Sequence, residues 1–157
     1  MIKNNKGITI LVLAITIAVL LILLGITIDT STKVIESAKL QNINTNMLLI
    51  QARVKVISEK VVFDGDNSAY RGEKISDVTY ETIENLKNIG IIDTQDQNYS
   101  SYYIWDQSLL NEFGMDKIKL NSGQYFVVNY ATNEVITTEG ITFNGNTYYK
   151  LSETKDL

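Results

Sequence analysis

The side chains that could do chemistry in this chain are mostly carboxylates. The 157 residues include no His and no Cys. Without these residues, tetrahedral zinc sites, Ser-His-Asp triads and Cys-His dyads cannot be built. The remaining candidates for acid–base chemistry are the pairs Glu81/Glu84 and Asp93/Asp96. Glu81 and Glu84 lie among many solvated positions, where a charge pair is usually only polar surface. The sequence therefore favours a protein that is not an enzyme and predicts no catalytic residue.

Oxygen ligands for calcium could gather at two polar segments. Asp64 and Asp66 begin like a calcium-binding loop, but the Gly and the Glu that such a loop requires do not follow at the right distances. Asp93, Asp96 and Asn98 are weak calcium candidates in the next polar stretch, where an ordinary exposed loop is the simpler interpretation. We therefore expect no metal and no cofactor.

The aromatic residues and the net charge bear on binding. Nine Tyr residues and Trp105 could form a carbohydrate- or surface-binding patch, although most are expected at the edge of the core with their hydroxyls reaching water. All 18 acidic residues but only part of the 14 basic ones follow residue 28. This acidic balance argues against a surface that binds the phosphate backbone, so no nucleic acid partner is predicted.

The element that organises the chain is the apolar run Ile8–Ile28, ITILVLAITIAVLLILLGITI. It contains no charge, and as a helix it would be about 32 Å long, which matches the hydrocarbon core of a bilayer. Its threonines are compatible with a bilayer because each hydroxyl can bond back to its own helix. Lys3 and Lys6 precede the run, with no acidic residue among residues 1–7. We therefore expect a single pass, with the N-terminus inside and residues 63–157 outside the cytoplasmic membrane.

The helix is expected to continue beyond the membrane over residues 29–62; a local break at Thr30, Ser31 and Thr32 is the alternative. Charged and polar residues surround one apolar stripe with three-four spacing, as in an amphipathic helix. A coiled coil is conceivable, but packing on the chain's own domain is the preferred interpretation. The stripe consists of Leu40, Ile43, Met47, Ile50, Val54, Ile57 and Val61.

The remaining residues, 63–157, predict an α+β domain that the 29–62 helix completes. Short helices are expected at Thr79–Ile89 and, capped by Asp106, at 107–113. An antiparallel meander of four or five strands should follow, with its clearest hairpin at Asn144-Gly145. The expected strands are 102–105, 117–120, 124–130, 134–139, 141–143 and 147–151; the face under the helix should carry Phe126, Val128, Tyr130, Ile136, Phe143, Tyr149 and Leu151, and the tail 152–157 should fray.

This order of elements resembles the type IV pilin and type II secretion pseudopilin superfamily. The resemblance is carried by Lys6-Gly7 followed directly by the apolar run, and over residues 63–157 it rests on architecture and on the stretch NYATNEVI. It implies a leader of residues 1–7, cleavage by a prepilin peptidase between Gly7 and Ile8, methylation of the new amine, and Thr9 as the second mature residue. The implied partners are other pilin or pseudopilin subunits and the membrane.

One residue departs from the family's pattern. The fifth mature residue is usually Glu, whose carboxylate is thought to neutralise the mature N-terminal amine in the filament, and here it is Val12. The resemblance then implies a minor subunit of a pilus or pseudopilus. The alternative is an uncleaved, single-pass, membrane-anchored domain that binds a ligand or another envelope protein.

Overall fold

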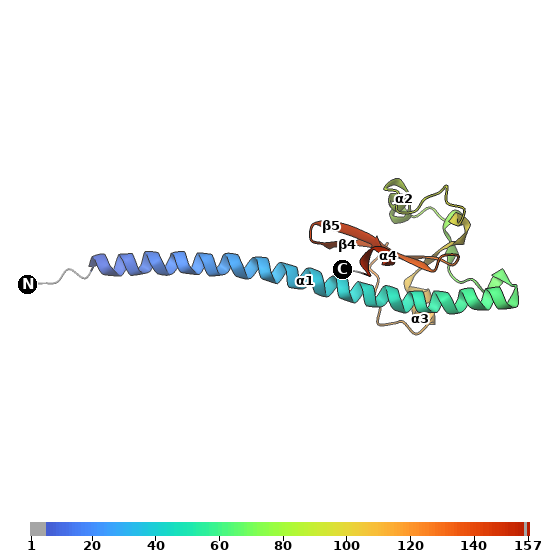
Figure 1. The fold of residues 1–157 in the computed structure, drawn as a ribbon, viewed down its shortest axis with the longest axis horizontal. Coiled ribbons are helices and arrows are strands. Elements are labelled where there is room, and N and C mark those ends of the chain that lie inside the picture. The colour runs from blue at the N-terminus through green and yellow to red at the C-terminus, as the bar shows by residue number, and fades with distance from the viewer. Residues whose placement is uncertain (1–5, 156) are drawn as a thin grey trace, which may run out of the picture. The chain divides into compact units, whose positions relative to one another are not determined.

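The structure is a computed structural model that describes residues 6–155 and 157; within its first helix, the side chains of residues 6–11 and 23–31 are not described. That helix, α1, comprises Lys6–Asp64 (Figure 1). The helix expected over residues 8–62 is therefore present with nearly the expected bounds. The chain divides into two compact units, residues 1–38 and 39–157.

The second unit is built on a five-stranded antiparallel sheet. Its strands are β1 (Glu73–Lys74), β2 (Tyr102–Trp105), β3 (Phe126–Asn129), β4 (Glu134–Phe143) and β5 (Asn146–Lys150), and each pairs with the next in chain order. Asn144 and Gly145 turn β4 into β5 with φ angles of 50° and 79°, as a two-residue hairpin requires. The predicted α+β class is confirmed.

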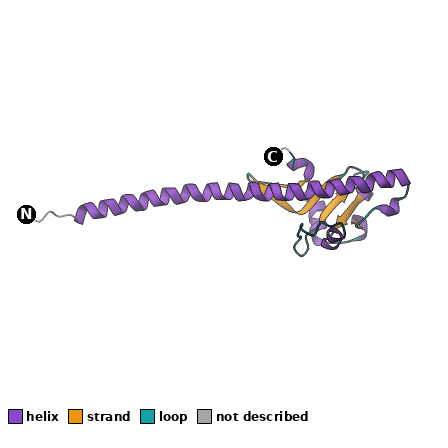
Figure 2. Ribbon diagram, turned by 90° about the horizontal axis from the view of Figure 1, so that it is seen from below, coloured by secondary structure: helices purple, strands orange, loops and turns teal. Residues whose placement is uncertain are grey.

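The amphipathic part of α1 packs on one face of this sheet, as Figure 2 shows for the part of α1 that belongs to the second unit. Met47, Ile50 and Val54 are fully buried. They join Trp105 and Val128 in a cluster of apolar side chains, which we call the helix-side core. The predicted stripe therefore packs on the chain's own domain, and Ile43, which is partly buried, is the only one of its seven residues that is not buried.

The other face of the sheet is also covered, which the sequence analysis did not anticipate. Helix α2 (Glu81–Asn88) buries Ile83 and Leu86 there, in a second cluster that we call the α2-side core. Ile136 and Tyr149 belong to this second cluster, so their assignment to the face under α1 was wrong. The reason is register: Ile136 is opposite Val127, and directly paired residues share a face.

Two further expectations were wrong. Residues 117–120 form no strand; they lie in the connection between α3 (Gln107–Glu112) and β3, where Ile118 is buried in the helix-side core. Residues 134–139 and 141–143 form one strand, β4, with an irregularity between Ile136 and Ile141.

Residues 152–154 belong to a short helix, so the expectation that this part of the tail frays was wrong. Helix α4 (Leu151–Thr154) begins where the Glu153 carboxylate accepts the backbone N–H groups of Tyr149 and Lys150, both at 3.1 Å. Leu151 is fully buried in the helix-side core, and the Thr154 carbonyl accepts a hydrogen bond from Asn44 Nδ2 on α1 at 2.9 Å. Burial of one apolar residue and one helix-to-helix bond thus fix a segment that looks polar in sequence.

Candidate functional site

The residues predicted to direct processing and assembly lie in the first unit. Gly7, Ile8 and Thr9 are in α1, but their side chains lie outside the described residues, as do residues 1–5 of the expected leader. Val12 is described and is 55% exposed. The structure therefore adds side-chain information at only one of the four predicted positions.

The described part of the apolar run, residues 12–22, presents apolar side chains on every side of the helix. Their exposed fractions range from 48% to 64%. Thr16 is the only polar residue among them, and its hydroxyl donates to the Val12 carbonyl at 2.8 Å, which hides its polarity within the helix as expected. Large exposed apolar surfaces are often sites of lipid or protein contact. The large exposed apolar residues of this segment are Val12, Leu13, Ile15, Ile17, Val19, Leu20, Leu21 and Ile22.

Within the described part of the chain, no helix is both long enough and apolar enough to cross a membrane.

Glu84, Asp93 and Asp96, three of the candidate carboxylates, each make a contact within their own segment. Glu84 pairs with Lys87 at 2.7 Å within α2. Asp93 accepts the backbone N–H of Gln95 and Asp96 that of Asn98, both at 2.8 Å, so each carboxylate closes its own turn. Among the described residues no group of three or more acidic side chains is placed to hold a metal ion.

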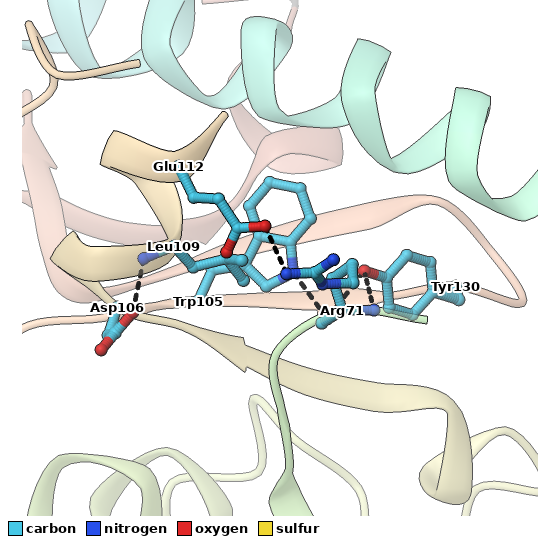
Figure 3. A network of polar contacts seen from close by, with 6 residues as sticks. All are labelled: Arg71, Trp105, Asp106, Leu109, Glu112 and Tyr130. Carbon is cyan, nitrogen blue, oxygen red and sulfur yellow. Dashed lines mark hydrogen bonds and ion pairs between the residues drawn. The ribbon is translucent and has the colours of Figure 1, made fainter. Parts of the chain in front are cut away.

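The aromatic residues separate into two groups. Trp105, Tyr103 and Tyr130 are buried in the helix-side core. Two of them, Trp105 and Tyr130, bond to the backbone of Arg71 (Figure 3). Trp105 Nε1 donates to the Arg71 carbonyl at 3.1 Å, and the Tyr130 hydroxyl donates to the same oxygen at 2.8 Å. Tyr130 also accepts the Arg71 backbone N–H at 3.1 Å. These three residues are buried in the core, whereas most of the aromatics were expected at its edge with their hydroxyls reaching water.

Tyr80 and Tyr125 belong to the second group, because they line an open pocket. Their rings stack with centroids 4.9 Å apart and an interplanar angle of 14°. The pocket has a volume of about 310 Å³, and its wall includes Glu73, Asp106 and Ser108. The Tyr80 hydroxyl donates to Glu73 Oε2 at 2.8 Å, and this hydrogen bond, with burial adding to it, raises the pKa of Tyr80.

The pocket continues to the ion pair between Arg71 and Glu112, which lies on the exposed side of α3 (Figure 3). Sequence reasoning missed this site because its residues come from β1, the start of α2, the end of β2, α3 and the segment before β3. No spacing in the sequence signals that they meet. The high number of tyrosines was the one available signal, and it did not indicate which of them are accessible.

Comparison with known proteins gives no relative for this chain: no protein-family model, no curated protein and no solved structure matches it. Function must therefore be argued from the helix, the sheet and the pocket.

Proposed function

We propose that this protein is a non-enzymatic structural subunit, present in few copies, of a filament of the type IV pilus or pseudopilus kind. The observation that carries the proposal is α1. One helix combines a part whose apolar side chains are exposed all round, at residues 12–22, with a part whose apolar stripe is buried on an antiparallel sheet. A subunit of a helical filament needs both parts, one to hold its own domain and one to contact neighbours.

A second observation on the second unit supports the same role. Leu49, Val56 and Phe63 are 52%, 56% and 90% exposed, although they lie on α1 beside the buried stripe in sequence. At 100° per residue they lie about 100–180° around the helix from Ile50 and Val54, so they are outside the buried stripe. The outer side of α1 therefore carries apolar side chains that another subunit's helix could cover.

In this proposal Ile8–Ile28 holds the subunit in the cytoplasmic membrane before assembly, and neighbouring helices replace the lipid afterwards. The exchange costs little, because lipid chains and apolar helices are similar surroundings for such side chains. The domain of residues 63–157 lies outside the membrane, and a prepilin peptidase removes residues 1–7.

Cleavage is the first test. Mass spectrometry of the protein isolated from its host should give a mature chain that starts at Ile8. The matched control is Gly7→Leu, which leaves the charge of the leader unchanged and adds a side chain at the proposed cleavage position; this variant should retain Met1. A wild-type chain that keeps residues 1–7 in cells with an active prepilin peptidase would contradict the proposal. It would favour the alternative, an uncleaved, membrane-anchored domain that binds a ligand or another envelope protein.

A further inference from the structure

We propose that the open pocket walled by Arg71, Glu73, Tyr80, Asp106, Glu112 and Tyr125, which we call the tyrosine pocket, binds a neutral saccharide. All of these residues belong to the second compact unit. The saccharide proposal therefore does not depend on whether the protein is a filament subunit.

The strand register places the polar and aromatic groups on one face of the sheet. Glu73 is opposite Ile104, and Trp105 is opposite Phe126. Asp106 directly follows Trp105, Tyr125 directly precedes Phe126, and both line the pocket. Because Asp106 is two residues from Ile104, their side chains point to the same face. Glu73, Asp106 and the Tyr125 ring thus share the face on which Tyr80 stacks.

The polar groups are held in place before any ligand arrives. Asp106 Oδ1 caps α3 by accepting the Leu109 backbone N–H at 2.8 Å, and its other oxygen accepts no hydrogen bond from the described residues. Glu73 likewise uses one oxygen, Oε2, for the Tyr80 hydroxyl. The Arg71 side chain is held by Glu112 while its backbone is held by Trp105 and Tyr130. Fixed partners of this kind reduce the entropy lost on binding.

The mixture of charges selects the class of ligand. The carboxylates of Glu73 and Asp106 oppose an anionic ligand, and the Arg71 guanidinium, which is paired with Glu112, reduces the attraction of the pocket for a cationic one. A neutral ligand with many hydroxyls fits both, because each hydroxyl can donate to a carboxylate and accept from the guanidinium or from Ser108. The Tyr80–Tyr125 stack adds an apolar ring surface for the C–H face of a sugar. A volume of about 310 Å³ lies at the small end of ligand pockets, which suits one or two sugar units.

The experiment is saturation-transfer difference NMR on the full chain in dodecylphosphocholine micelles. This detergent is chosen because a glycoside detergent would itself compete for the pocket. The probes are N,N′-diacetylchitobiose, cellobiose and lactose, with trilysine and inorganic phosphate as charged probes. We expect transfer to the ring protons of at least one disaccharide, with weaker or no transfer to the charged probes.

The variants test the location. Tyr125→Ala should weaken the binding of the responding disaccharide at least tenfold. Because Tyr125 also packs against the α2-side core, Asp106→Asn is the second variant: Asn still caps a helix but removes one charged acceptor, and binding should weaken at least threefold with an unchanged circular dichroism spectrum. Tyr148→Ala, a partly exposed tyrosine of β5 that does not line the pocket, is the matched control and should bind like the wild type.

Three results would overturn the inference. They are no transfer to any of the three disaccharides, disaccharide binding that Asp106→Asn and Tyr125→Ala leave unchanged, and binding of trilysine or phosphate in preference to every disaccharide. The last result would show that the pocket prefers a charged ligand to a neutral saccharide.

Discussion

At the scale of single residues, Tyr130 links the core to the segment that leads into β1. Its side chain is buried, and burial raises the pKa of its phenol to about 12, although hydrogen bonding to the Arg71 backbone acts in the opposite direction. A phenol whose pKa is higher in the folded than in the unfolded protein keeps its proton longer when folded. Its contribution to stability is therefore complete below pH 10 and is lost as the pH rises towards 12.

The prediction concerns Tyr130→Phe. Near pH 8 the variant should be less stable than the wild type by about 1–3 kcal/mol, because the Arg71 carbonyl and N–H lose their shared partner. Above pH 10 the wild type should lose stability faster than the variant, since only the wild type must keep a buried phenol protonated. Urea unfolding followed by Trp105 fluorescence between pH 8 and pH 11.5 measures the difference. If the difference in free energy of unfolding between the wild type and Tyr130→Phe stays constant over this range, Tyr130 does not titrate in the way described.

At the scale of elements, the central contact is between α1 and the sheet. Ile50 is fully buried in the helix-side core, whereas its neighbour Leu49 is 52% exposed. In a chain shortened to begin at Asp29, Ile50→Ala should lower the free energy of unfolding by about 2–5 kcal/mol because it leaves a cavity. Ile50→Asp should prevent folding, because an unpaired buried carboxylate costs far more than a cavity.

Leu49→Ala is the matched control, and it should change the free energy of unfolding by no more than about 0.5 kcal/mol. Denaturant unfolding monitored by circular dichroism measures all three variants. If Ile50→Ala and Ile50→Asp both behave like Leu49→Ala, α1 does not contribute to the core of the domain.

The sequence predicted the elements whose signals are local. The periodic stripe of α1, the Asp106 cap of α3 and the Asn144-Gly145 turn each follow from a few neighbouring residues, and each is present. The wrong predictions discussed next concern residues whose positions depend on partners distant in sequence. The faces of Ile136 and Tyr149 are set by cross-strand register, and α4 is fixed by Leu151 burial and by a bond from Asn44. The tyrosine pocket could not be predicted for the same reason.

At the scale of the whole molecule, Val12 determines how the protein is expected to assemble. If the chain is cleaved before Ile8, the new ammonium group enters a filament core that contains little water, and an unpaired charge there costs several kcal/mol. Val12 cannot supply the counter-charge, but a carboxylate of a neighbouring subunit at the same depth can. We therefore predict that this protein joins filaments built mainly from another, Glu-bearing subunit and does not polymerise alone.

Val12→Glu is the variant that tests this role. It should still insert in the membrane, because a charge near the cytoplasmic edge can reach the headgroups. It should also raise the number of copies per filament, since each subunit would then carry its own counter-charge. Val12→Leu, which changes only apolar volume, is the matched control and should leave the copy number as in the wild type.

Immunogold labelling of filaments sheared from the host, with an antibody against residues 63–157, measures how many copies of the protein each filament contains and where they lie. We expect gold particles on filaments at one or a few sites each, concentrated near an end, with more particles per filament for Val12→Glu. Dense, even labelling of the wild type would contradict the minor role. Filaments without any label, with the protein confined to the membrane fraction, would contradict the proposal that this protein is a filament subunit.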